Sequence, residues 1–324
     1  MTREHILSLS YGKDSLACLA AIEQLGWPLD RIVHAEVWAT DEIPADLPPM
    51  VEFKAKADAI IKARWGIEVE HLCAMKNGEK LTYEKLFYHV PKRKPGGKFS
   101  GYTVAGYPYQ KGAWCQDRLK GNVLDAISTH THTEAVAGFP FVIGSWCKKL
   151  KDGTYRLGGQ SWADHGATAA SSGGVSPGSL ARGAKKNIVR YLGIAADEPV
   201  RIERHQKPGF KLPLVEAGWT EAMCRDWCQE NNLLSPIYTD SARGGCWFCH
   251  NQGVGQLRLL RKNYPDLWAL LLKWDLDSPV SFKPNGKTVH DYDRRFHLED
   301  EGLIKPEDRF LWSMLDEELN YRWF

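Results

Sequence analysis

Residues 5–15 read His-Ile-Leu-Ser-Leu-Ser-Tyr-Gly-Lys-Asp-Ser, and this stretch decides the fold. Its first six residues, with Ile6, Leu7 and Leu9 among them, predict a short buried strand. Apolar residues then recur at helical spacing: Leu16, Leu19, Ala20 and Ile22. In the turn between strand and helix, Gly12 lets the backbone approach a ligand closely, and the following helix N-terminus offers N–H groups and a positive dipole end. The stretch therefore predicts a phosphate-binding loop.

The side chains of this loop suit a nucleotide that carries a metal ion. Ser10 and Ser15 offer hydroxyl donors, and Lys13 offers a cation. Asp14 would repel a phosphate unless a cation lay between them, and Mg²⁺ on a pyrophosphate would supply that cation. The spacing differs from the Walker pattern, which places four residues between its first glycine and Gly-Lys.

Strands and helices continue to alternate after the loop. We expect a second strand at 32–38, a helix from Pro48, a third strand at 67–71 and a return to the sheet at 187–194. This alternation predicts an α/β fold, a parallel sheet with helices on both faces.

The composition changes twice along the chain. Residues 129–186 are rich in Gly and Ser and predict an insertion or loop, whereas the last quarter is rich in Trp, Leu and Phe at helical spacing. We expect a nucleotide-binding α/β domain at 1–215, with the insertion at about 129–186, and a mostly helical C-terminal region at 216–324.

Charge and hydropathy narrow the range of partners. The 42 basic and 40 acidic residues give a formal net charge of +2, so the whole molecule has no field that would attract a polyanion. The sequence has neither a transmembrane run nor a signal-peptide pattern, so we expect a cytoplasmic protein without a membrane partner.

The loop resembles the signature Ser-Gly-Gly-x-Asp-Ser of the PP-loop (adenine nucleotide alpha hydrolase) superfamily, with Tyr11 in place of the first glycine. Within that superfamily the chain resembles the phosphoadenosine phosphosulfate (PAPS) reductase family. The resemblance implies a Rossmann-like PP-loop fold that binds ATP or PAPS with Mg²⁺. The nucleotide-binding residues it implies are Ser10, Tyr11, Gly12, Lys13, Asp14 and Ser15.

Three further segments extend this resemblance along the chain. Thr40-Asp41-Glu42-Ile43-Pro44 is similar to a Thr-Gly-x-Glu-Phe-Pro block, which would add Thr40 to the nucleotide site. Residues 114–120 (WCQDRLK) are similar to a Trp-Cys-Thr-x-x-Leu-Lys block, and residues 193–201 (GIAADEPVR) to a Gly-x-Arg-x-x-Glu-Ser-x-x-Arg block. They imply that Lys120 and Arg201 contact the nucleotide or substrate, although a surface charge explains either residue equally well.

Cys246 and Cys249 form a Cys-x-x-Cys in residues 243–250 (RGGCWFCH), where a glycine-led turn would let two thiolates converge on one metal ion. Zinc and iron–sulfur clusters both use such pairs. Cys228, near the end of a predicted helix, and Cys115, by resemblance, are the further candidate ligands of Zn²⁺ or a [4Fe–4S] cluster. A redox pair or simple structural thiols remain alternatives.

Both ends of the chain bear on the reaction. A reductase of this family needs a cysteine in a C-terminal Glu-Cys-Gly-x-His tail, and no cysteine follows Cys249. The loop keeps Asp14, which the resemblance assigns to Mg²⁺–pyrophosphate chemistry. We therefore expect an ATP pyrophosphatase-type enzyme that adenylates an acceptor, with sulfur transfer as a following step. Its catalytic residues would be Lys13, Asp14, Lys120 and Arg201.

The acceptor is unknown, and both nucleic acids and small molecules are candidates. Two alternative functions remain open: a sulfonucleotide (PAPS or APS) reductase, and an accessory protein that binds a nucleotide without turnover.

Overall fold

A computed structural model describes residues 3–76, 78–91, 95–97, 100–108, 114–129, 147–149, 155–157, 160–161, 188–240 and 245–306. The chain forms two compact units, each assembled from separated segments. Unit 1 comprises 1–37, 48–81 and 116–240, and unit 2 comprises 38–47, 82–115 and 241–324. This division differs from the expected boundary at 215/216, because part of the expected helical region belongs to unit 1.

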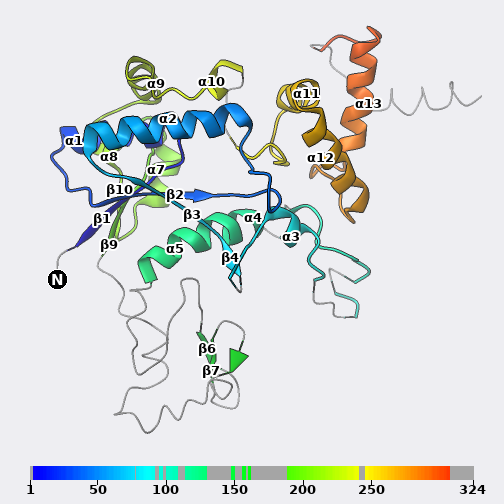
Figure 1. The fold of residues 1–324 in the computed structure, drawn as a ribbon, viewed down its shortest axis with the longest axis horizontal. Helices are drawn as coiled ribbons and strands as arrows, with labels where there is room; N and C mark the ends of the chain where they lie inside the picture. Colours follow the sequence, from blue (N-terminus) through cyan, green and yellow to red (C-terminus); the bar gives the residue numbers. More distant parts are fainter. Residues whose placement is uncertain are drawn as a thin grey trace, which may run out of the picture. The chain divides into compact units, whose positions relative to one another are not determined.

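Unit 1 holds the sheet and most of the strands (Figure 1). Its main elements are β1 (Glu4–Ser8), α1 (Lys13–Gln24), β2 (Arg31–Glu36), α2 (Pro48–Trp65), β3 (Val69–Cys73), α5 (Asn122–Thr129), β9 (Ile188–Tyr191), α7 (Pro199–His205), β10 (Phe210–Lys211), α8 (Pro213–Glu216), α9 (Glu221–Glu230) and α10 (Ile237–Asp240). Its minor elements are the hairpin β4 (Met75–Lys76) and β5 (Glu79–Lys80), the π-helical turn η2 (Asp117–Gly121), and β6 (Cys147–Lys149), β7 (Tyr155–Leu157) and β8 (Gln160–Ser161).

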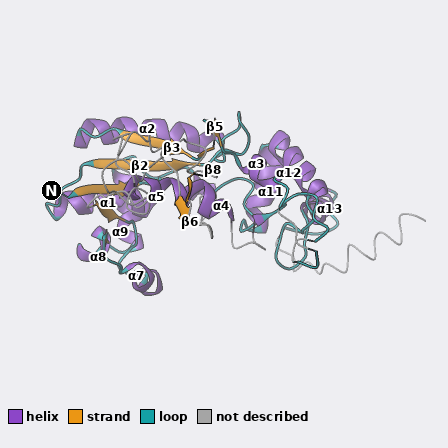
Figure 2. Cartoon of the chain, turned by 90° about the horizontal axis from the view of Figure 1, so that it is seen from below, coloured by secondary structure: helices purple, strands orange, loops and turns teal. Residues whose placement is uncertain are grey.

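The main sheet has five strands in the order β10-β9-β1-β2-β3, and every pair in it is parallel. The strands run side by side in Figure 2. The chain first moves outward from β1 to β3, and then returns to the other side of β1 to add β9 and β10. Because parallel crossovers are right-handed, this reversal places helices on both faces of the sheet. Figure 1 accordingly shows α2 on one side of the strands and α5 on the other. The predicted α/β fold with a parallel sheet is confirmed.

The element positions follow from the sequence pattern, with small shifts at the ends. The expected strand at 32–38 ends earlier, at Glu36, and the third strand lies at Val69–Cys73. Helix α9 begins after Thr220, whose hydroxyl caps it by accepting the Met223 N–H at 3.3 Å. Most of the expected insertion at 129–186 lies outside the described residues.

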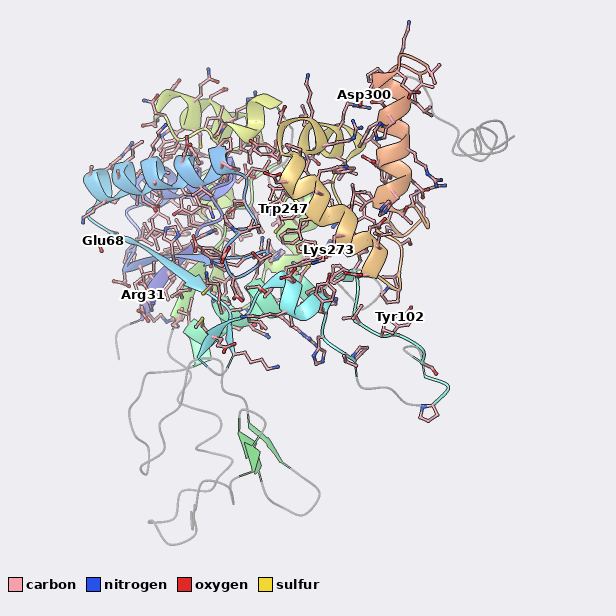
Figure 3. The ribbon with its side chains drawn as sticks, turned by 45° about the vertical axis from the view of Figure 1, so that its right-hand side comes forward. Arg31, Glu68, Tyr102, Trp247, Lys273 and Asp300 are labelled. Carbon is pink, nitrogen blue, oxygen red and sulfur yellow. The ribbon has the colours of Figure 1, made fainter. Side chains whose placement is uncertain are left out.

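Near the amino ends of β1, β2 and β3, one arginine joins the three strands. Arg31 on β2 forms two 2.6 Å bonds with the carboxylate of Glu70 on β3, and a 3.1 Å bond with Glu4 on β1. Arg31 is labelled in Figure 3. A bidentate pair of this kind fixes strand register as well as adding charge attraction.

Unit 2 contains α3 (Tyr83–Phe87), the first two residues of α4 (Trp114–Gln116), α11 (Val254–Asn263), α12 (Pro265–Asp277) and α13 (Val289–Asp300). Aromatic side chains fill its core. Trp247, labelled in Figure 3, stacks on Trp274 with ring centroids 5.5 Å apart, and Phe248 lies 4.1 Å from Tyr83. On the last helices, Glu299 pairs with both Arg258 and Arg295.

No helix among the described residues is long and apolar enough to cross a membrane.

Candidate functional site

The loop at residues 10–15 lies where the order in which strands are added to the sheet reverses. It follows β1, whose neighbours are β2 on one side and β9 on the other. In open parallel sheets, ligands bind outside the carboxyl ends of the strands at such a reversal point. The topology therefore places the predicted phosphate loop where this kind of sheet binds ligands.

The two serines of the loop hold it in shape. The Ser15 hydroxyl accepts the Ser10 N–H at 3.1 Å and donates to the Gly12 carbonyl at 2.9 Å. The Ser10 hydroxyl lies 3.0 Å from the Ser15 hydroxyl. The serines thus organise the loop itself, in addition to any contact with a phosphate.

Gly12 occupies the N-cap of α1 and provides no side-chain cap for the first turn. The Lys13 N–H donates to the Tyr238 hydroxyl at 3.2 Å. A Cβ atom on Gly12 would lie 3.4 Å from that hydroxyl and 3.5 Å from Ser10 Oγ, which is ordinary contact. The uncapped first turn leaves helix N–H groups to bind an anion.

Gly193, two residues beyond the end of β9, lies against the loop. A Cβ atom here would lie 2.7 Å from both the N and the Cα atoms of Ser15. The backbone of α1 can approach β9 this closely only because residue 193 has no side chain. This glycine opens the block at 193–201, and no local pattern in the sequence indicates its role in packing.

Three carboxylates gather beside the N-terminus of α1: Asp14, Glu198 and Glu221 have oxygens within 4.8 Å of one another. Lys13 Nζ lies 2.6 Å from Asp14 and 3.4 Å from Glu221. Arg201, half-exposed, pairs with Glu198 at 2.6 Å. Glu198 stands at the Glu position of the block at 193–201 but had no role in the sequence-based prediction, and Glu221 lies outside every motif, because only the fold brings the two to Asp14.

The charges in this cluster shift one another. Burial raises the pKa of Asp14, and the nearby Glu221 and Glu198 raise it further, so the Lys13 ion pair offsets only part of the change. Burial alone would lower the pKa of Lys13, but its bonds to Asp14 and Glu221 outweigh burial and raise it. Such a cluster favours a further cation, and carboxylate oxygens are the ligands that Mg²⁺ prefers.

Tyr11 stands where the resembling signature has its first glycine. Its φ angle is +56°, in the left-handed region that glycine adopts freely. For other residues this conformation costs about 1–2 kcal/mol. Its side chain is fully buried, so the tyrosine has other contacts that hold it in place.

Two other predicted residues make no contact with the loop among those described, and a third joins the carboxylate cluster. Thr40 belongs to unit 2, where its hydroxyl accepts the N–H groups of Glu42 and Ile43 at 3.3 and 3.0 Å. Lys120 is exposed on η2 and, among the described residues, makes no ion pair with the loop. Of the implied cationic helpers, Arg201 alone joins the cluster, through Glu198.

The four predicted cysteine ligands are divided between the units. Cys228 belongs to unit 1, where its thiol donates to the Lys13 carbonyl at 3.3 Å. Cys18 and Cys224 lie in the same hydrophobic core. Burial raises the pKa of Cys224 and Cys228 to about 12, so both thiols are protonated at neutral pH.

Cys115, Cys246 and Cys249 belong to unit 2 and lie around Tyr83. The Tyr83 ring is fully buried, and its hydroxyl has no hydrogen-bond partner among the described residues. Burial raises the pKa of Tyr83 well above its ordinary value, and the charges of the three cysteines raise it further. Their three sulfurs do not all lie within 4.8 Å of one another.

We refer to Cys115, Cys246 and Cys249 as the cysteine knuckle, and Lys283 adds a cation beside one of them, Cys249. Its ammonium donates to the carbonyls of His250, at 2.5 Å, and Gln252. Burial lowers the pKa of Lys283, and the nearby Cys249 opposes that change. The thiols thus fit zinc or iron in ligand type, and a buried polar atom and a cation face them, but the fold alone does not draw them together.

Comparison with known proteins gave no match to any family model, curated protein or solved structure. The resemblance to the PAPS reductase family therefore depends on the motifs quoted above.

Proposed function

We propose that the chain binds ATP with Mg²⁺ at residues 10–15 and transfers its adenylyl group to an acceptor. The observation that carries the proposal is the meeting of the phosphate loop with Asp14, Glu198 and Glu221 at the reversal point of the sheet. A phosphate cradle beside three carboxylates suits a nucleotide that arrives with a divalent cation.

Different residues would bind the phosphate oxygens and the Mg²⁺ ion. The first-turn N–H groups of α1 and the hydroxyls of Ser10 and Ser15 would hold the phosphate oxygens. Asp14, Glu198 and Glu221 would hold Mg²⁺, which when bound neutralises the charge that develops on the leaving pyrophosphate. Lys13, displaced from its carboxylates by that ion, would turn to a phosphate oxygen.

In the proposed reaction an acceptor oxygen forms a bond to the α-phosphorus of ATP. The bond from that phosphorus to the oxygen bridging the α and β phosphates breaks, and pyrophosphate leaves with the bonding electron pair. The protein's contribution is positioning and charge stabilisation, since no covalent step on the enzyme is needed. Lys120 and Arg201 remain proposed contacts to the nucleotide or acceptor.

The thiols near the loop favour this function over a sulfonucleotide reductase. A reductase needs a thiolate, whereas Cys224 and Cys228 are held protonated by burial. Measuring pyrophosphate release distinguishes the enzyme from an accessory protein that binds ATP without turnover. We also infer that Cys115, Cys246 and Cys249 hold Zn²⁺ or an iron–sulfur cluster in unit 2.

The test measures ATP binding by calorimetry with Mg²⁺, and pyrophosphate release with nucleic-acid and small-molecule acceptors. Pyrophosphate formation that depends on the acceptor is the expected result. Sulfite release from PAPS with a thiol donor would instead establish the reductase.

A further inference from the structure

Tyr11 is joined to a polar network that the phosphate chemistry does not use. Its hydroxyl bonds to Asp58 Oδ1 on α2 and lies 3.0 Å from His71 Nε2 on β3. The same His71 nitrogen is 2.8 Å from Asp58 Oδ2. The other ring nitrogen of His71 is 3.0 Å from Glu36, the last residue of β2. The loop is thereby tied to three separate elements of unit 1.

The proton positions in this network follow from its partners. Asp58 and Glu36 are acceptors, so His71 donates to both carboxylates only as the doubly protonated imidazolium. These two bonds raise the pKa of His71 to about 9, with Asp58 as the larger cause. The bond from His71 lowers the pKa of Glu36. At neutral pH the Tyr11 hydroxyl therefore donates to a carboxylate that the imidazolium holds in place.

Two buried residues in contact with the Tyr11 ring, His34 and Lys54, complete the charge balance of this network. His34 Nδ1 is 2.8 Å from the Leu9 carbonyl, so this nitrogen carries the proton. His34 Nε2 must then accept from the ammonium of Lys54, 2.7 Å away. Lys54 and His71 supply two positive charges, and Glu36 and Asp58 two negative ones. His34, Glu36 and His71 also place ligand atoms within 4.8 Å of one another, but His34 Nε2 is already bonded to the Lys54 ammonium.

We propose that Tyr11 is a positioning residue of the nucleotide site, and that its bonds to Asp58 and His71 hold the phosphate loop in its binding conformation. The inference rests on the proposed function and names what shapes that same loop. It does not make Tyr11 a group that touches the reacting atoms.

The backbone conformation of Tyr11 explains why the loop needs a hydrogen bond to Asp58, which lies 47 residues away in the sequence. Tyr11 lies between Ser10 and Gly12 in a left-handed conformation that a tyrosine leaves readily unless its side chain is fixed. Rotation of its φ angle to a negative value would move both neighbours, and with them the Ser10–Ser15 bond. The ring itself packs edge-on against His34, with centroids 4.8 Å apart, but this contact has no directional bond that would fix the hydroxyl end of the side chain.

The test compares two tyrosine-to-phenylalanine variants. Tyr11→Phe removes the hydroxyl but keeps the ring and leaves the Asp58–His71 pair intact. The control is Tyr191→Phe on β9, which is equally buried and loses bonds to the Pro28 carbonyl and to His5, 2.9 and 2.8 Å long. We expect Tyr11→Phe to weaken ATP binding roughly tenfold in calorimetry and Tyr191→Phe to leave it within about twofold.

ATP affinity measured across a pH series adds a result that would not change if Tyr11 had only a structural role. In the wild type, ATP affinity should fall as the pH rises through about 9, because His71 then loses the proton that holds Asp58. In Tyr11→Phe this fall should disappear. Equal affinity of Tyr11→Phe and wild type across the series overturns the inference, as does equal weakening by both phenylalanine variants.

Hydrogen exchange separates failure of the inference from failure of the proposed function. The amides of residues 12–16 should exchange faster in Tyr11→Phe than in the wild type and Tyr191→Phe. If the wild type binds no ATP, the proposed function fails, while faster exchange confined to these amides still supports the positioning role of Tyr11. Unchanged exchange at these amides overturns that role.

Discussion

The phosphate loop of unit 1 and the cysteine knuckle of unit 2 differ in how their own contacts hold them. In the loop, Ser10, Ser15 and Tyr11 are all hydrogen-bonded within the unit. In the knuckle, the thiols lie around the Tyr83 hydroxyl, which has no partner among the described residues. The loop is held in shape by its own hydrogen bonds, whereas the three sulfurs of the knuckle do not all lie within 4.8 Å of one another. Substitutions should therefore act on the loop through shape and on the knuckle through metal content.

The largest effect should come from Gly193→Val, which tests whether the loop is preformed by close packing. The new side chain would meet the Ser15 backbone at 2.7 Å, and backbone atoms cannot give way as a flexible side chain can. We expect a loss of about 3 kcal/mol or more in the free energy of unfolding, and no ATP binding. Urea denaturation and calorimetry check both.

The control for Gly193→Val is Gly255→Ala on α11, whose new Cβ atom would have no neighbour within 4 Å. It should leave the free energy of unfolding unchanged or raise it by up to about 1 kcal/mol. A Gly193→Val protein of wild-type stability would refute the close packing of β9 on α1.

Gly12→Val tests the loop as an anion cradle without disturbing its packing. Its φ angle of −77° suits any residue, so the fold and the circular dichroism spectrum should persist. The branched side chain would fill the space at the uncapped helix N-terminus, and we expect calorimetry to detect no ATP binding. Gly12→Ala, whose Cβ atom makes ordinary contacts, should retain most of the affinity. Undiminished binding by Gly12→Val would falsify the site.

Joint replacement of Cys246→Ser and Cys249→Ser tests the knuckle side of the comparison. We expect anaerobically purified protein to contain zinc or iron, and the double variant to lose it, because a site with both thiolates removed keeps too few ligands. Metal analysis and the anaerobic absorbance spectrum measure the loss. Cys228→Ser is the matched control and should keep its metal, since that thiol bonds to the Lys13 carbonyl. Full metal content in the double variant contradicts the site.

The sequence predicted the loop better than it predicted the surroundings of the loop. Residues 10–15 are contiguous, and their helix begins where the apolar spacing begins, so local pattern was sufficient. Glu198 and Glu221 reach Asp14 only because the chain returns to the far side of β1, an order that no local pattern encodes. Thr40 and Cys228 were placed by motif and spacing. Neither signal could reveal that the Thr40 hydroxyl accepts the Ile43 N–H or that the Cys228 thiol donates to the Lys13 carbonyl, 215 residues away in sequence.

Asp14→Asn tests whether the carboxylates serve turnover. The amide keeps the shape of the loop but removes one charge from the proposed Mg²⁺ ligands. We expect kcat for pyrophosphate release to fall roughly tenfold to a hundredfold, with a much smaller change in ATP affinity. Asp197→Asn, adjacent to Glu198 and bonded instead to the Glu221 N–H, is the control. A loss of affinity with unchanged kcat would assign Asp14 to ground-state binding.

The smallest effect should be the pH dependence of stability that His71 brings to the loop's support. The His71 pKa is raised from 6.5 to about 9, so its two ion pairs contribute their full stability below pH 6.5. That contribution is lost as the pH rises through about 9, because the unfolded chain releases the proton earlier than the folded one. The ring is partly exposed, so solvent screening limits the loss to roughly 1–3 kcal/mol.

Urea denaturation at pH 6 and pH 10 should show this fall in the wild type and a reduced fall in His71→Gln. His290→Gln is the control, because its single ion pair with Asp275 belongs to unit 2. Equal falls in the wild type and His71→Gln would mean that His71 is not protonated in the folded protein, and would leave Tyr11 without the ion pair that holds its acceptor.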